Sequence, residues 1–270
     1  MPLYRKTNRE ARKLLSKIPG LFDLTDRVAV VTGGDRGIGR SIAIGLAEAG
    51  ASVAIAARNQ EKSQQTLSEL KAIGVPCMAV KLDVTDRPAL EPALQQVERE
   101  LGPIGILVNN AGIASLSGGV LNEKAEDWDR VIETQLTAVF LLSKLAARSM
   151  LSQGSGKIIN LGSMYSYFGS GLVPSYSAAK GAIMQLTKSM AIEFAPHNIQ
   201  VNAIAPGWIE TDLTVAVRSM PMNDEILART PAGRWGKPDE MIGTAVFLAS
   251  RASDFVMGTT IPVDGGYAIR

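Results

Sequence analysis

Short β-branched apolar runs alternate along this chain with longer stretches of helical periodicity, and this alternation constrains its fold more than any other feature. Residues 104–108 and 157–161 are near-continuous apolar runs, as expected of central strands buried on both faces. Because parallel strands need crossover helices, a repeated strand–helix order favours a parallel sheet with helices on both sides. We predict strands at residues 28–31, 52–57, 77–82, 104–108, 157–161, 199–204 and 260–263, and helices at residues 38–49, 60–73, 88–101, 125–150, 175–194 and 238–250.

The predicted organisation is one α/β domain, a doubly wound parallel sheet in a three-layer α/β/α arrangement. No Pro-, Gly- or Ser-rich linker interrupts the pattern, so we predict a single domain over residues 23–270 after a basic extension over residues 1–22. The longest irregular connection, residues 208–234, has the length of a functional lid. The pairs Thr211-Asp212 and Asp224-Glu225 indicate short helices within it.

Composition narrows the class of protein. Apolar residues make up 46% of the 270-residue chain, which is enough for a sizeable core. A formal net charge of +2 gives no global electrostatic argument for binding nucleic acid or a membrane, and we predict neither as a partner. The single cysteine, Cys77, excludes an intramolecular disulfide and is compatible with a reducing cytoplasm, where we place the protein. One histidine and one cysteine disfavour a zinc site, and we predict no metal.

The first twenty residues are strongly basic, with one acid, Glu10, against the side chains Arg5, Lys6, Arg9, Arg12, Lys13 and Lys17. They contain no apolar core of the length that a secretory signal needs. A short helix ended by Pro19-Gly20 would carry an apolar stripe of Leu3, Ala11, Leu14, Leu15 and Ile18. The segment is interpreted as an arm on the domain or on a neighbouring subunit, with an anionic-membrane or organelle-targeting role as the alternative.

A glycine-rich turn joins the first predicted strand to the first predicted helix. Its glycines let the backbone turn tightly and approach a pyrophosphate with no Cβ in the way. The start of the helix adds free N–H groups and a positive dipole end. Glycines are also common in ordinary turns, but this junction is the one that dinucleotide binding requires. The predicted cofactor residues in the turn are Gly33, Asp35, Arg36, Gly37, Ile38 and Gly39.

The end of the second predicted strand indicates which dinucleotide binds. Enzymes that choose NAD usually place an acidic residue there, which accepts hydrogen bonds from the ribose 2′-hydroxyl. This chain has Ala57, Arg58 and Asn59 instead, so no carboxylate at this strand end repels a 2′-phosphate, and Arg58 can pair with it. Arg36 in the glycine-rich turn supplies a second positive charge. We therefore predict that NADP(H) is preferred over NAD(H), with Arg58 and Asn59 among the binding residues.

Three polar residues in the second half of the chain can carry out ketone reduction. Tyr176 and Lys180 are four residues apart, which places both on one face of a helix. A lysine ammonium beside a phenol is expected to lower the tyrosine pKa and to make proton exchange feasible near neutrality. Ser163 follows a central strand, and its hydroxyl can donate to the substrate oxygen as charge develops there. Singly, these residues would be an ordinary helix pair and an ordinary helix cap; the glycine-rich turn upstream favours the chemical interpretation.

The motifs together occur in a fixed order: Thr32-Gly33-x-x-x-Gly37-x-Gly39, Asn109-Asn110-Ala111-Gly112, Ser163, Tyr176-x-x-x-Lys180 and Pro206-Gly207. In order and approximate spacing they resemble the short-chain dehydrogenase/reductase family, from about Leu24 to the C-terminus. The resemblance implies a Rossmann-type fold, hydride transfer and a homotetramer. It also implies that the cofactor contacts Asp83 and Val84 at the adenine, Asn109, Ala111 and Gly112 along its length, Tyr176 and Lys180 in the catalytic set, Pro206 and Gly207, and Ile209 and Thr211 at the nicotinamide amide.

One position departs from that family's pattern. Family members commonly carry an asparagine in the long helix before the serine, where it helps to hold a water against the lysine and so relays protons. Here Gln135 stands at that place. Glutamine keeps the amide but moves it by one methylene. Either Gln135 still organises the water, which we favour, or the relay is altered and turnover is slow.

The substrate is less constrained than the reaction. Residues 202–208 and 231–236 are similar to those of gluconate 5-dehydrogenases and 2-deoxygluconate 3-dehydrogenases, which favours a sugar, sugar acid, polyol or other small carbonyl compound. A fatty-acid-type 3-oxoacyl-thioester reductase and a non-catalytic dinucleotide-sensing regulator are the alternatives. Aromatic faces suit a sugar or a cyclic ketone, although these side chains could instead pack inward or fill a subunit interface: Met164, Tyr165, Tyr167, Phe168 and Trp208. Arg218 is the best candidate to clamp a carboxylate, though a surface role suits it better, and His197 is interpreted as a loop residue.

Overall fold

The strands follow the alternating pattern of the sequence in a computed structural model that describes residues 17–270. All seven predicted strands are confirmed, and their ends agree with the prediction to within two residues. The strands are β1 (Val28–Thr32), β2 (Ser52–Ala57), β3 (Cys77–Lys81), β4 (Ile104–Asn109), β5 (Gly156–Leu161), β6 (Ile199–Pro206) and β7 (Thr260–Val263). Every residue of β1, β4, β5 and β6 is buried, which explains why apolar side chains predominate in these strands.

The strands form one sheet in the order β3-β2-β1-β4-β5-β6-β7, and neighbouring strands are parallel throughout. From β1 the chain runs outward to β3, crosses to β4 on the other side of β1, and continues to β7. This confirms the predicted doubly wound sheet. The direction of winding reverses between β1 and β4, and ligands of such sheets bind beside this reversal, at the carboxyl ends of the strands.

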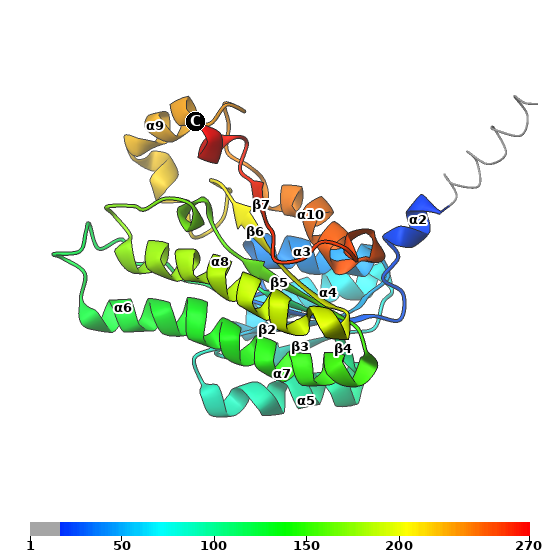
Figure 1. The fold of residues 1–270 in the computed structure, drawn as a ribbon. Coiled ribbons are helices and arrows are strands. Elements are labelled where there is room, and N and C mark those ends of the chain that lie inside the picture. The colour runs from blue at the N-terminus through cyan, green and yellow to red at the C-terminus, as the bar shows by residue number, and fades with distance from the viewer. Residues whose placement is uncertain (1–16) are drawn as a thin grey trace, which may run out of the picture.

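Helices cover both faces of the sheet, as Figure 1 shows. One face packs against α3 (Gly37–Glu48), α4 (Gln60–Ile73) and α10 (Ile242–Ala249), and the other against α5 (Arg87–Leu101), α7 (Ala138–Gln153) and α8 (Pro174–Phe194). Successive side chains of β1 serve opposite faces, with Val28 and Val30 in the core under α5, α7 and α8, and Ala29 and Val31 in the core under α3 and α10. The central strands are therefore mostly apolar on both faces, and buried polar residues such as Lys157 and Asn160 have hydrogen-bond partners.

Two predicted helices are divided in the structure. The helix expected over residues 125–150 consists of α6 (Ala125–Ile132), a π-helical turn (Glu133–Thr137) and α7. The helix expected over residues 238–250 begins as a 3-10 turn (Pro238–Met241) that leads into α10. The apolar periodicity continues through both junctions, so the pattern of side chains does not reveal where the backbone hydrogen bonding changes.

The connection after β6 and the segment before β1 contain short helices. Asp224 and Glu225 lie in the first turn of α9 (Met222–Arg229), as predicted, whereas Thr211 and Asp212 lie in a bend and turn rather than in a helix. Pro19 and Gly20 were expected to end a helix but lie within the short helix α2 (Ile18–Leu21), because proline is tolerated in a first turn. The rest of the predicted N-terminal stripe lies outside the described residues. Across residues 17–270, no helix has the length and apolar character needed to cross a bilayer.

Candidate active site

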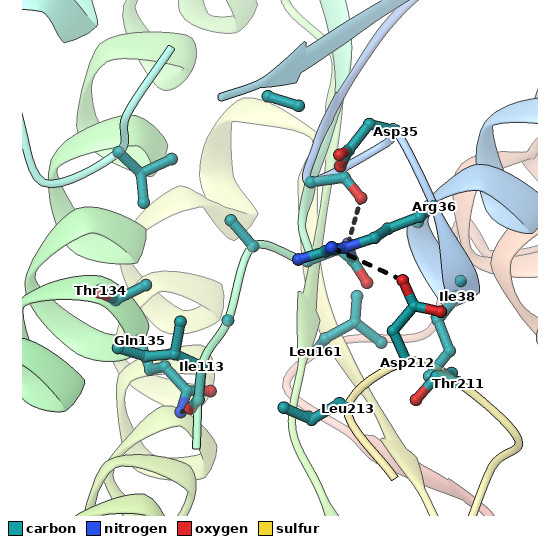
Figure 2. Close-up of a pocket in the computed structure, with 18 of the residues that line it drawn as sticks. Asp35, Arg36, Ile38, Ile113, Thr134, Gln135, Leu161, Thr211, Asp212 and Leu213 are labelled. Atoms are coloured by element: carbon teal, nitrogen blue, oxygen red, sulfur yellow. Dashed lines mark hydrogen bonds and ion pairs between the residues drawn. The ribbon is translucent and has the colours of Figure 1, made fainter. Parts of the chain in front are cut away.

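A cleft of about 760 Å³ opens at the carboxyl ends of the central strands. Figure 2 shows Arg36 and Asp212 on one side of it and Thr134, Gln135 and Ile113 on the other. Most of the residues predicted from the sequence line this cleft: Gly33, Asp35, Arg36, Gly37, Ile38, Gly39, Arg58, Asn59, Asp83, Val84, Ala111, Gly112, Gln135, Ser163, Tyr176, Lys180, Pro206, Gly207, Ile209 and Thr211. The structure therefore brings residues from nearly the whole domain to one site.

The glycine-rich turn is shaped as a phosphate cradle. Gly33 and Gly37 have φ angles of +63° and +52°, which L side chains rarely adopt. A Cβ on Gly39 would overlap the carbonyl oxygen of Gly33 and Nδ2 of Asn110, so only glycine fits there. Arg36 is the extended residue before α3, and no side chain caps that helix. The N–H groups at the start of α3 therefore remain available to an anion.

Asn110, which belongs to the motif at residues 109–112 but was not predicted to be a cofactor residue, holds this cradle against β4. Its Nδ2 donates to the carbonyl oxygens of Thr32 (2.9 Å) and Gly33 (3.1 Å), and its N–H donates to Oγ1 of Thr32 (3.0 Å). Asn109, the predicted residue, does not line the cleft; it is buried and donates to Ser143 and Asn160. The two asparagines are consecutive at the end of a strand, where neighbouring side chains point to opposite sides.

The expected 2′-phosphate end of the cleft carries more charge than the sequence analysis foresaw. Arg58 lies 3.6 Å from Oδ2 of Asp83, and Arg36 lies 3.6 Å from Oδ2 of Asp212. Partial burial acts to raise the pKa of Asp83, but hydrogen bonds from Thr85 and the Arg58 charge hold it below its usual value. The end of β2 itself carries Ala57 and no acid, as the prediction required. Both predicted cations are nevertheless paired with carboxylates from other segments.

Ser163, Tyr176 and Lys180 come from two elements that meet in the cleft. Ser163 follows β5 and caps the 3-10 turn Met164–Ser166, where its Oγ accepts a hydrogen bond from the N–H of Tyr165 (3.2 Å). Its hydroxyl hydrogen stays available, so the cap role and the chemical role are compatible. Tyr176 and Lys180 lie one turn apart on α8, with Nζ of Lys180 5.5 Å from the centre of the Tyr176 ring.

Burial dominates the protonation of this pair. It lowers the pKa of Lys180 to about 7, and Nζ of Lys180 donates to the carbonyl oxygen of Leu161 at 2.6 Å. Burial also raises the pKa of Tyr176, against the effect of a hydrogen bond with Ser163. The pKa of Tyr176 therefore lies above its ordinary value and not below it as expected, because loss of solvent penalises the phenolate.

Gln135 lies in the π-helical turn and is buried, with 1% of its surface exposed. Its Nε2 donates to the carbonyl oxygen of Ile113, which borders the cleft. Its Oε1 has no hydrogen-bond partner within residues 17–270 and lies 3.1 Å from where a Cβ on Gly112 would stand. A buried acceptor of this kind requires a donor, and a bound water would supply one.

Of the other candidate residues near the site, Tyr165 contacts Tyr176, and the rest pack elsewhere or are exposed. Tyr165 stands edge-on to Tyr176, with ring centres 6.2 Å apart, and also meets Trp208 at 6.3 Å. Met164 is buried, Phe168 packs on Tyr165, and Tyr167 is exposed. Arg218 lies 3.6 Å from Glu210, which supports the surface role, and His197 is exposed in the 3-10 turn before β6.

Comparison with known proteins identifies the family of this chain. Residues 33–268 match the family described as enoyl-(acyl carrier protein) reductase. The gluconate 5-dehydrogenase of Gluconobacter oxydans is 42% identical over 93% of this chain and 98% of its own length. The 5-keto-D-gluconate 5-reductase of Escherichia coli K12 is 40% identical over 92% and 98%. The crystal structure of a gluconate 5-dehydrogenase from Burkholderia cenocepacia, in complex with NADP and tartrate, is 40% identical, superimposes with a TM-score of 0.90, and covers 94% of this chain and 99% of that one. With its motifs, its sheet order and these relatives, the chain belongs to the short-chain dehydrogenase/reductase family.

Proposed function

We propose that the protein is an NADP(H)-dependent oxidoreductase that interconverts a secondary alcohol and a ketone. The observation that carries this proposal is the convergence of Ser163, Tyr176 and Lys180 on the same cleft as the glycine cradle. The cofactor fits the residues present, because Gly33 and Gly37 adopt conformations that admit a close backbone approach. When bound, the nicotinamide supplies the hydride to the carbonyl carbon or removes it from the alcohol.

The chain's own residues manage the proton and the substrate oxygen. In reduction, the Tyr176 hydroxyl gives its proton to the oxygen as the hydride reaches carbon, and in oxidation it takes the proton back. Ser163 donates a hydrogen bond to the same oxygen and stabilises its developing charge. We further propose that Lys180, which is protonated below its pKa of about 7, and Gln135, whose Oε1 has no partner within residues 17–270, pass a proton toward Tyr176 through water.

NADP(H) is the proposed cofactor in preference to NAD(H). Support comes from Arg36 and Arg58 in the cleft, from the absence of an acid at the end of β2, and from relatives crystallised with NADP. Initial rates with NADPH and NADH at equal concentration test this. Faster turnover with NADH would contradict it.

A sugar acid is the proposed substrate, because relatives at about 40% identity over nearly the whole chain are named for gluconate and keto-gluconate. Tyr165 and Trp208 offer aromatic surfaces next to Tyr176 that suit a sugar. NADPH oxidation should be measured with keto-gluconates, simple ketones and 3-oxoacyl thioesters, with Tyr176→Phe as the inactive control. Preference for acyl thioesters would favour the fatty-acid alternative, and tight NADPH binding without turnover would favour a dinucleotide sensor.

We also propose a homotetramer, a cytoplasmic location, and residues 23–270 as the folding unit. Large apolar side chains are exposed on the neighbouring helices α6, α7 and α8, namely Trp128, Phe140 and Ile192. Exposed apolar side chains of this size are typical of surfaces that another subunit covers. Light scattering after size-exclusion chromatography tests the homotetramer, and cell fractionation tests the cytoplasmic location. The stability of a fragment of residues 23–270 tests the domain boundary.

A further inference from the structure

Lys62, which was not predicted to bind the cofactor, forms an ion pair with Asp212, a residue that lines the cleft. Lys62 lies in the first turn of α4, where the side chain of Asn59 caps its N–H at 2.9 Å. Its Nζ lies 2.8 Å from Oδ2 of Asp212, and Nη1 of Arg36 lies 3.6 Å from the same oxygen. Figure 2 shows Asp212 turned toward Arg36. One carboxylate therefore bridges two cations that come from the glycine-rich turn and from α4.

Arg36 and Lys62 share this carboxylate beside the expected 2′-phosphate end of the cleft, although Lys62 itself is not one of the lining residues. Arg36, Arg58, Asn59 and Asp212 all line the cleft. The hydrogen bond from Lys62 and the nearby Arg36 charge keep the pKa of Asp212 below its usual value, so it is ionised at neutral pH. A phosphate monoester carries more negative charge than a carboxylate and offers three acceptor oxygens. Exposed ion pairs are weak, so a phosphate can replace Asp212 at little cost.

We propose that Lys62 is a further specificity-determining residue for the 2′-phosphate of NADP(H), and that Asp212 is an internal anion which this phosphate displaces from Lys62 and Arg36. The proposal rests on the proposed NADP(H) function. Asp212 adjoins Thr211 and follows Ile209, which also line the cleft and which the family resemblance assigns to the nicotinamide amide. Release of Asp212 therefore alters the segment that covers the cofactor, and the 2′-phosphate influences that segment as well as affinity.

Calorimetric titration of the full chain with 2′,5′-ADP and with 5′-AMP tests this without catalysis, because the two ligands differ in the 2′-phosphate. Lys62→Gln is expected to weaken 2′,5′-ADP binding roughly fivefold and to leave 5′-AMP binding unchanged. Asp212→Asn is expected to tighten 2′,5′-ADP binding about two- to fivefold. Both effects should shrink as ionic strength rises. The matched controls are Lys71→Gln in the last turn of α4 and Glu210→Gln, a carboxylate of the same connection that pairs with Arg218.

The outcomes separate this inference from the function on which it rests. If the wild-type protein binds both nucleotides equally, the NADP(H) preference itself is wrong. If the wild type discriminates but Lys62→Gln behaves as Lys71→Gln, the role of Lys62 is wrong while the cofactor preference stands. Weaker 2′,5′-ADP binding by Asp212→Asn would show that Asp212 supports the phosphate rather than competing with it. Each substitution changes a polar side chain at the surface, so we expect the fold to be retained. Thermal unfolding of each variant checks this.

Discussion

Gly39→Ala should destabilise the protein, although alanine is normally the better helix residue. Gly39 lies in the first turn of α3, packed against the cradle rather than against solvent. A Cβ at this position would overlap the carbonyl oxygen of Gly33 and Nδ2 of Asn110. The same Nδ2 donates to the carbonyl oxygens of Thr32 at 2.9 Å and Gly33 at 3.1 Å. The added methyl group therefore forces Asn110 away from the cradle.

The magnitude follows from three effects. Each hydrogen bond lost from Asn110 costs about 1 kcal/mol. Overpacking in a rigid region costs about 1–3 kcal/mol. Replacing glycine by alanine within a helix returns about 1 kcal/mol. The free energy of unfolding should therefore fall by about 2–4 kcal/mol, which lowers Tm by roughly 4–16 °C for a chain of this size.

Gly243→Ala in α10 is the matched control. It is also a helical glycine, but no atom of residues 17–270 outside its local backbone lies within 4 Å of the added Cβ. This variant should be stabilised by about 0.5–1 kcal/mol. Thermal and urea unfolding of both variants provide the measurement, with NADPH titration to follow the cradle. If Gly39→Ala is as stable as the wild type, the tight fit around Asn110 is wrong.

Three further changes probe the site and the core. Reduction should slow as pH rises through about 7, because Lys180 loses its proton there while the raised pKa of Tyr176 keeps the phenol protonated. A flat pH profile of kcat/KM between pH 6 and 9 would argue against this. Gln135→Asn should lower kcat about tenfold, because the shorter side chain cannot both donate to the carbonyl oxygen of Ile113 and present its oxygen to the cleft; unchanged or higher activity would show that asparagine is tolerated. Lys157 is buried, with 4% exposed, and its Nζ lies 2.9 Å from Oδ1 of Asp254. Asp254→Asn should therefore lower the free energy of unfolding by roughly 1–2 kcal/mol, whereas Lys157→Met should leave it nearly unchanged. Equal losses of unfolding free energy in urea would contradict this difference.

The sheet was predictable because burial on both faces leaves a direct trace in the sequence. Val28 to Val31 are all apolar because alternate side chains serve two cores, and β4 and β5 are mostly apolar for the same reason. Helix ends were predictable where side chains or glycine mark them. Asn59 caps α4, and Gly74 ends it with a φ of +92°. These signals are local, so they survive without knowledge of the tertiary structure.

The features that sequence reasoning missed depend on contacts between distant segments or on small changes in backbone geometry. Lys62 and Asp212 are separated by 150 positions, and neither residue alone indicates an ion pair over the cleft. Which of Asn109 and Asn110 faces the glycine cradle depends on where β4 ends. The π-helical turn that carries Gln135 differs from its flanking helices by the span of its hydrogen bonds, which apolar periodicity does not record.

The protonation of Tyr176 and Lys180 shows how position within the fold changes the chemistry that spacing alone implies. Four-residue spacing places both groups on one helix face, and from that alone an ammonium would be expected to stabilise phenolate. The structure buries Lys180 and partly buries Tyr176 where it lines the cleft, and loss of solvent penalises each charged form: the pKa of Tyr176 rises and that of Lys180 falls to about 7. A neutral phenol is the form that can give a proton, so burial keeps Tyr176 in the protonated form that ketone reduction requires. The lysine then acts less as a fixed charge than as a group that gains and loses its proton near neutral pH, which is the property a proton relay to Tyr176 requires.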